Sequence, residues 1–220
     1  LSKAKSRFFR HNRVDDLEKK LKGFDGKKLV IIEGVYSMDG DVPPLAEIVE
    51  VCRKYGARLM IDEAHSAFVY GETGKGVVED QGFDDEVDIH LGTFSKSLGG
   101  QGGYTAGTHK LINYLRGFSR SRVFSCALSP VVVAGILKAL ELARNEPELR
   151  TQLWDNVAYM QRLLADAGVP IGDSTSQVIP IMVRDDARCL QMCENVFREG
   201  VYINPVRYPA VGKHKSRFRM

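Results

Sequence analysis

Three short apolar runs and the helix-like segment between the first two limit the folds open to this chain. KLVIIEG and RLMID are rich in branched aliphatic residues, as buried strands are. Between them, PLAEIVEVCRKYG repeats apolar residues at the spacing of one helix face. A third apolar run, VDIHLG, follows. This strand–helix–strand order predicts a parallel α/β sheet.

Further elements extend this pattern in both directions. VDDLEKKLKG before the first run predicts a short helix, and GGYTAG predicts a fourth strand. Residues 130–167 predict a long helical region with a break near Asn145–Pro147. After it, QVIPIMV, DDARCLQMCENVFREG and VYINPV predict strand, helix and strand. We therefore expect residues 1–145 to belong to a large domain, and 146–220 to form a connecting helix and part of a small α/β domain.

Composition narrows the classes of function only a little. The 220 residues have a net charge of +3, which is too small to indicate a nucleic-acid or membrane partner. The basic residues Lys3, Lys5, Arg7 and Arg10 are expected to form a solvated edge. No apolar run reaches the ~20 residues of a membrane span, and the four cysteines show no C-x-x-C pair. This cysteine usage is typical of a reducing cytoplasm, and no metal site is predicted.

Polar side chains follow the predicted strands at the point where each strand ends. In an open parallel sheet, ligands bind outside these carboxyl ends. The polar residues at these ends are Ser37, Asp62, His65, Thr93, Ser95 and Lys96. Their convergence predicts one binding edge.

The run IDEAH has a second interpretation, as the Mg²⁺-binding strand end of a DEAH-type ATPase. That interpretation needs a phosphate loop, G-x-x-x-x-G-K-[ST], upstream. Lys96-Ser97 lies downstream, and Ser95 precedes it instead of glycine. The position of Lys96-Ser97 after IDEAH and the residue before it both disfavour the ATPase interpretation.

The same residue types suit a pyridoxal phosphate enzyme better. Such an enzyme needs a lysine for a Schiff base and a carboxylate that keeps the pyridine nitrogen protonated. It also needs hydroxyl and backbone N–H donors for the phosphate. Lys96, Asp62, Thr93 and Ser95 are of these types. His65 is of the type that donates near the ring's 3-oxygen.

Four longer stretches resemble the α-oxoamine synthase family in order and spacing. These are EGVYSMDGDVPPL, DEAHSAFVYGETGKG, GTFSKSLGGQGGYTAG and VFSCALSP. The resemblance implies a fold-type-I pyridoxal phosphate transferase, like aspartate aminotransferase: a mostly parallel large domain and a smaller C-terminal α/β domain. It also implies a homodimer with active sites at the subunit interface, which joins an amino acid to an acyl-CoA.

The resemblance assigns roles by position. Lys96 would form the Schiff base, and Asp62 would pair with the pyridinium nitrogen. His65 and Ser37 would lie near the ring and its 3-oxygen. Thr93 and Ser95 would bind the phosphate. Ser125 would reach the phosphate of the partner subunit.

The C-terminal stretch VYINPVRYPAVGKHKSRFRM resembles the family's substrate-domain strand and loop. Arg219 falls where the family's arginine binds the amino acid carboxylate, a group that a guanidinium fork suits. Arg207 matches a second arginine of some members. Lys215 and Arg217 are expected to be solvated charges.

Within the family, YINPV and GTFSKSLGG favour the serine palmitoyltransferase branch, which condenses L-serine with palmitoyl-CoA, with decarboxylation, to 3-ketosphinganine. The main alternative is 8-amino-7-oxononanoate synthase of biotin synthesis, which uses alanine. That branch usually has Thr where this chain has Ala210. Glycine C-acetyltransferase is a third possibility.

An alternative of another class is a fragment or an inactive partner subunit. The chain begins at Leu1 inside a basic segment and stops at RFRM, which resembles a strand. We therefore expect an N-terminally truncated piece of a longer protein. The presence of Lys96 favours an active subunit.

Overall fold

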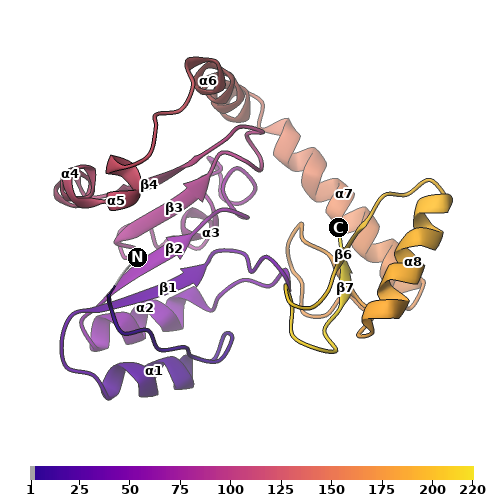
Figure 1. Ribbon diagram of the computed structural model, residues 1–220, viewed down its shortest axis with the longest axis horizontal. Helices are drawn as coiled ribbons and strands as arrows, with labels where there is room; N and C mark the ends of the chain where they lie inside the picture. Colours follow the sequence, from indigo (N-terminus) through magenta and orange to yellow (C-terminus); the bar gives the residue numbers. More distant parts are fainter. Residues whose placement is uncertain (1–2) are drawn as a thin grey trace. The chain divides into compact units, whose positions relative to one another are not determined.

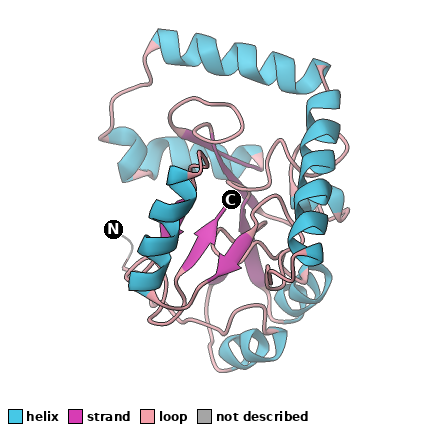
Figure 2. Cartoon of the chain, turned by 90° about the vertical axis from the view of Figure 1, so that its right-hand side faces the viewer, coloured by secondary structure: helices cyan, strands magenta, loops and turns pink. Residues whose placement is uncertain are grey.

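The computed structural model describes residues 3–220, which form two compact units. The first unit comprises the described residues up to Gly34 together with Pro43–Asn145. The second comprises Val35–Val42 and Glu146–Met220. Figure 1 shows the elements in chain order, and Figure 2 shows the same chain by secondary structure. Each unit is described by itself below.

The first unit is built on a four-stranded sheet of order β1-β2-β3-β4. The first three strands are parallel and β4 is antiparallel to β3. The strand bounds are β1 Lys28–Glu33, β2 Ala57–Asp62, β3 Ile89–Thr93 and β4 Gly103–Gly107. The predicted strands are therefore confirmed, and so is the mostly parallel α/β class.

Helices and strands of the first unit share one apolar core. Val30 and Ile32 of β1, together with Leu59 and Ile61 of β2, are buried in the cluster that includes Leu45 and Ile48 of α2. The other side of β1 differs from prediction, because Leu29 and Ile31 are exposed. Among the described residues, β1 is buried on one face only. The helix bounds are α1 Val14–Lys22, α2 Leu45–Lys54, α3 Val77–Asp80, α4 His109–Phe118, α5 Arg120–Val123 and α6 Pro130–Asn145.

The second unit has its own small sheet and core. Its strands β5 (Pro180–Met182), β7 (Arg217–Arg219) and β6 (Asn204–Val206) are antiparallel, in that order. Helix α8 (Asp186–Arg198) buries Cys189 against Ile203 and Phe218. Helix α7 (Glu148–Asp166) begins the main part of this unit. Cys189 is fully buried in this core.

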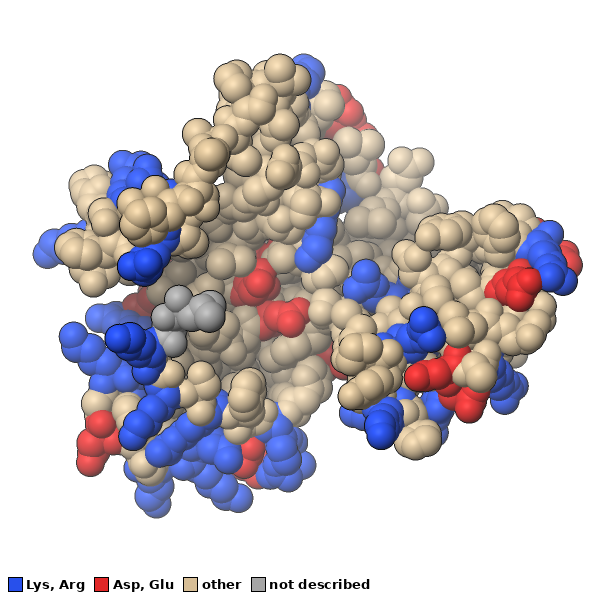
Figure 3. Space-filling view, viewed as in Figure 1, with Lys and Arg blue, Asp and Glu red and all other residues tan. Residues whose placement is uncertain are grey.

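The surface charges follow the sequence expectation. Lys3, Lys5, Arg7 and Arg10 are all exposed. Figure 3 shows lysine and arginine side chains gathered over the region of α1, whose last turn holds Lys19, Lys20 and Lys22. Within residues 3–220, no helix has the length and apolar character needed to cross a membrane.

A buried carboxylate fixes the turn that follows β2. Glu63 is 1% exposed. Its Oε2 accepts hydrogen bonds from Ser66 Oγ and from Val77 N at 3.1 Å, and its Oε1 accepts one from Val78 N at 3.0 Å. The carboxylate therefore joins the turn after β2 to the start of α3.

Two glycines leave room for this carboxylate. A Cβ at Gly34 would lie 2.5 Å from both Glu63 Oε2 and Ser66 Oγ. A Cβ at Gly76 would collide with the same carboxylate, and Gly76 also has a φ of +126°. Side chains at either position would displace Glu63, so the glycines and the carboxylate form one local arrangement.

Burial raises the pKa of Glu63, and the hydrogen bonds from Ser66, Val78 and Val77 offset only part of this effect. A raised pKa means that the folded state binds this proton more tightly than the unfolded chain does. The group's contribution to stability is therefore complete below the ordinary glutamate pKa and is lost as the pH rises through the raised pKa.

We predict that Glu63→Gln removes this pH dependence. The free energy of unfolding of the wild type, minus that of the variant, should fall as the pH rises from about 4 to about 8, because only the wild type releases a buried proton. Denaturant unfolding across this range measures the difference. Glu141→Gln is the control, because Glu141 is an exposed residue paired with Lys138. A difference that stays flat or rises for Glu63→Gln would contradict the prediction.

Candidate active site

The carboxyl ends of β1, β2 and β3 lie along one edge of the first unit's sheet. Glu33 pairs with Asp62 in the parallel register, and Asp62 pairs with Leu91. Asp62 is the last residue of β2, and Thr93 is the last of β3. This is the edge at which parallel sheets bind ligands.

Asp62 is half-buried with one carboxylate oxygen engaged. Its Oδ1 accepts a hydrogen bond from Ala64 N at 2.9 Å. Ala64 N is the only hydrogen-bond partner of Asp62's side chain among the described residues, so Oδ2 keeps its acceptor capacity. His65 lies three residues later in the same turn and is also half-buried.

Tyr104 of β4 lies close to Asp62 and Glu63. Burial raises the pKa of its phenol, and the charges of Glu63 and Asp62 raise it further. Its ring packs on Phe94 with a centroid separation of 5.5 Å. The phenol therefore stays protonated beside two carboxylates.

Thr93 and Ser95 form a hydroxyl pair at the end of β3. Thr93 Oγ1 lies 2.8 Å from Ser95 Oγ and donates to Gly102 O at 3.0 Å. It also accepts from Ser95 N at 3.2 Å. The pair is fixed to its own loop, which presents polar groups of the kind that bind a phosphate.

Lys96 follows this pair and is exposed. Its neighbour Ser97 donates a hydrogen bond through Oγ to Ala67 O at 3.1 Å. Ala67 follows the turn that contains Asp62 and His65. The Ser97–Ala67 bond therefore joins the loop of Lys96 to the turn of the candidate acid and histidine.

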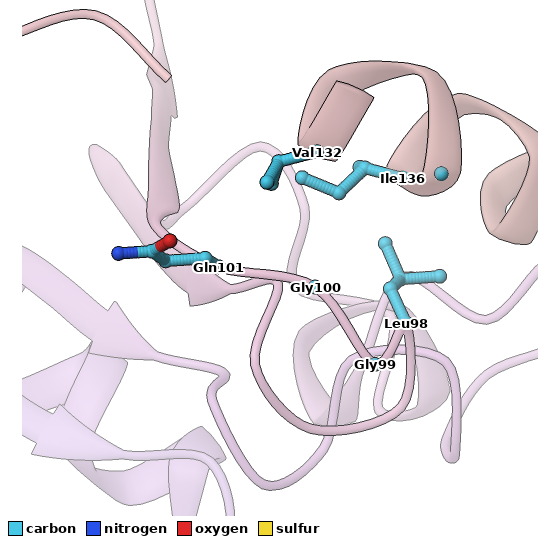
Figure 4. Close-up of a pocket in the computed structure, with 7 residues that line it drawn as sticks. Leu98, Gly99, Gly100, Gln101, Val132 and Ile136 are labelled. Atoms are coloured by element: carbon cyan, nitrogen blue, oxygen red, sulfur yellow. The ribbon is translucent and has the colours of Figure 1, made fainter. Parts of the chain in front are cut away.

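A shallow pocket of about 280 Å³ lies beyond Lys96 in the same loop. Figure 4 shows Leu98 directed from the loop toward α6, which carries Val132 and Ile136. Gly100 approaches α6 so closely that a Cβ there would lie 2.5 Å from Ile136 Cγ1. Predominantly apolar and glycine residues line this pocket, and none of them is a predicted site residue.

The remaining predicted residues lie elsewhere. Ser125 is exposed in the loop between α5 and α6. Ser37 and Arg219 belong to the second unit, where Arg219 Nη1 donates to Ser37 O at 3.1 Å.

Arg207 is exposed and directly follows β6. Val206 pairs with Arg217, whereas Arg219 pairs with Asn204. Arg207 and Arg219 therefore lie toward opposite ends of the β6–β7 pair.

The expectation that Arg217 is a solvated charge is wrong. Its residue exposure is 2%, and its guanidinium binds Asp39. A basic sequence context predicts solvent, but a partner far away in the chain gives this charge a buried position.

Sequence reasoning assigned no role to Glu63, although it lies between two residues that were singled out. Its signal was an acid directly after an apolar strand. Such an acid can turn toward the sheet interior only where glycines make room, and a sequence does not show which glycines approach it.

Known proteins of one family are similar to this chain in sequence and structure. The chain matches the family model described as aminotransferase class I and II over residues 1–220. It is 40% identical over 222 residues to 8-amino-7-oxononanoate synthase of Thermosipho melanesiensis, covering 100% of this chain and 57% of the relative. It is 42% identical over 214 residues to serine palmitoyltransferase of Bacteroides thetaiotaomicron, covering 96% and 54%.

Among solved structures, a serine palmitoyltransferase from S. paucimobilis with a bound PLP–myriocin aldimine is similar. Its TM-score is 0.91 and its identity 35%, over 96% of this chain and 54% of that chain. The chain thus spans little more than half the length of the relatives it matches.

A match along the whole chain leaves no place for the alternative interpretation of IDEAH as an ATPase motif. The fold and the relatives agree. The chain belongs to the aminotransferase class I and II family, with the fold of type I pyridoxal phosphate enzymes, and within it to the α-oxoamine synthases.

Proposed function

We propose that this chain is part of a cytoplasmic pyridoxal phosphate-dependent acyltransferase. The reaction condenses an amino acid, L-serine by preference, with a long-chain acyl-CoA such as palmitoyl-CoA, and releases CO₂. The product is an α-oxoamine of the 3-ketosphinganine type. The observation that supports it best is the Ser97–Ala67 bond, which joins the Lys96 loop to the turn of Asp62 and His65.

The residues at the strand ends fit the cofactor. Asp62 Oδ2 has acceptor capacity for a protonated ring nitrogen, since Oδ1 is held by Ala64 N. Thr93 and Ser95 offer paired hydroxyls for the phosphate. His65 and Ser37 would lie near the ring. When bound, pyridoxal phosphate supplies an electron sink for the carbanion of the amino acid.

Lys96 has two tasks in this proposal. Its amine would hold the cofactor covalently. Its Nζ, when not bonded to the cofactor, would take the α-proton of the amino acid, as a positioned base does. Because Lys96 is exposed among the described residues, solvent and substrate both reach it.

The amino acid carboxylate is assigned to Arg219. One of its nitrogens, Nη1, is engaged by Ser37 O, so its other donors can form a fork on a carboxylate. Arg207 is proposed as a second basic group for the substrate. Its exposed position allows this.

A second candidate, 8-amino-7-oxononanoate synthase, is favoured by relatives of that name. The relative named 8-amino-7-oxononanoate synthase is 40% identical in sequence to this chain, and the relative named serine palmitoyltransferase is 42% identical. Glycine C-acetyltransferase, which uses glycine, is a third candidate function. An inactive partner subunit is disfavoured by the presence of Lys96.

We also propose a homodimer in which Ser125 reaches the partner's cofactor phosphate. Exposed apolar side chains lie along α4–α6, including Phe124 at 76% and Val131 at 82% exposure. Tyr114 and Phe118 are stacked there at 4.6 Å between centroids, and both are exposed. Exposed aromatic and aliphatic side chains of this kind favour a protein–protein interface.

We predict that the absorbance spectrum of the bound cofactor shows which amino acid the protein prefers. With the complete, cofactor-loaded enzyme, L-serine should change the absorbance at lower concentration than alanine or glycine. Titration of each amino acid measures this order. Preference for alanine would favour the 8-amino-7-oxononanoate synthase alternative, and no response to any of them would refute the proposed function.

We predict that Lys96→Ala abolishes the absorbance band near ~420 nm that a lysine-bound cofactor gives, together with turnover. Lys19→Ala on α1 is the control and should keep both, because Lys19 is an exposed residue that pairs with Asp15 on the same helix. A Lys96→Ala enzyme that kept the band and turnover would show that another group holds the cofactor.

We predict that Phe124→Asp weakens the dimer of the complete enzyme at least about tenfold, because a charge replaces an apolar contact at an interface. Sedimentation over a range of concentrations measures this change. Phe197→Asp is the control, since Phe197 is an exposed phenylalanine on α8. Equal effects of the two substitutions would place the interface elsewhere.

A further inference from the structure

Arg217 is a buried cation in a short strand of the second unit. Its exposure is 2%, and three acceptors surround its guanidinium. Nη1 donates to Met38 O at 2.8 Å and to Asp39 Oδ1 at 2.6 Å, while Nε donates to Lys215 O at 3.0 Å. The proposed chemistry gives this residue no role.

Arg217 and Arg219 reach the same turn. Residues two apart in a strand point to the same side of the sheet. Arg219 Nη1 donates to Ser37 O, and Arg217 Nη1 donates to the next carbonyl, Met38 O. The two guanidinium groups therefore bind successive carbonyls of one segment, Val35–Val42.

That segment is a compact turn. Gly40 N donates to Tyr36 O at 2.8 Å, and Tyr36 N donates to Asp41 O at 2.9 Å. Thr175 N donates to Gly40 O at 3.2 Å, which ties the turn to the C-terminal part of the chain. A turn closed in this way moves as one piece, so a group that fixes Met38 and Asp39 also fixes Ser37 O.

Stability alone gives a weak reason for an arginine here. A buried ion pair contributes little net stability compared with a well-packed apolar side chain. The Asp39 side chain is 53% exposed, so its carboxylate keeps much of its hydration. An apolar residue would fill the position of Arg217 on β7, but it would not hold the turn's carbonyl and carboxylate.

We propose that Arg217 and Asp39 are positioning residues for Arg219. They hold the turn so that Ser37 O orients the Arg219 guanidinium toward the carboxylate of the amino acid substrate. Arg217 itself does not touch the substrate. This inference rests on the proposed function, in which Arg219 binds that carboxylate.

The test uses Arg217→Lys in the complete, cofactor-loaded enzyme. Lysine keeps the charge but cannot reach three acceptors in the planar geometry of a guanidinium. The KM for the amino acid should rise about tenfold, the cost of one misplaced charged hydrogen bond, while the KM for acyl-CoA stays within about twofold. Asp39→Asn should act in the same direction and, because its side chain is half exposed, leaves the core intact.

A second readout is independent of the cofactor. In the enzyme without pyridoxal phosphate, the amides of Tyr36 and Gly40 should exchange with solvent about tenfold faster in Arg217→Lys than in the wild type. Arg198→Lys is the matched control, because Arg198 forms an exposed pair with Glu194 at 2.6 Å in the same unit. It should change neither KM nor the exchange of the turn.

Arg219→Lys separates the inference from the proposal beneath it. If Arg219→Lys raises the amino acid KM and Arg217→Lys does not, the positioning role is wrong and the proposed function stands. If Arg219→Lys leaves that KM unchanged, the carboxylate assignment fails and the inference fails with it. Equal changes in both KM values for Arg217→Lys, with a lower melting temperature, would show a purely structural role.

Discussion

The parallel pairing of β1, β2 and β3 is the constraint on which the candidate site depends. Because Glu33, Asp62 and Leu91 are neighbours in register, the ends of these strands lie along one edge. Turns that leave this edge bring side chains of distant sequence together without a long loop. The hydrogen bonds that Glu63 accepts and the one that Ser97 donates then hold those turns, so Asp62 and Lys96 lie on segments that are tied to each other.

Sequence patterns predicted the strands and long helices well, because branched aliphatic runs and helical spacing depend on local residues. They did not include α4 and α5, although Leu111, Leu115 and Phe118 of α4 recur at helical spacing. The antiparallel direction of β4 was also not predicted. Strand direction depends on how the connection after β3 returns, and residue type alone does not specify it.

Some residues of the candidate site could also be predicted from local sequence, and others could not. Asp62, His65, Thr93, Ser95 and Lys96 could be selected because each follows a predicted strand. Arg217 could not, since its partner Asp39 is 178 residues away and a basic tail predicts solvent. The sequence does not select between two kinds of relative either, because a protein named 8-amino-7-oxononanoate synthase and one named serine palmitoyltransferase are about equally similar to the chain. Specificity depends on a few contacts, whereas similarity averages over all residues.

The excursion of Val35–Val42 into the second unit has a consequence for how this protein can be divided. The chain crosses between the units at Gly34, at Pro43 and again at Asn145. A cut after Asn145 would therefore not release an intact module, because the early turn would lose the arginines and the Thr175 amide that satisfy its carbonyls. An exchange of the second unit should therefore carry Val35–Val42 together with Glu146–Met220.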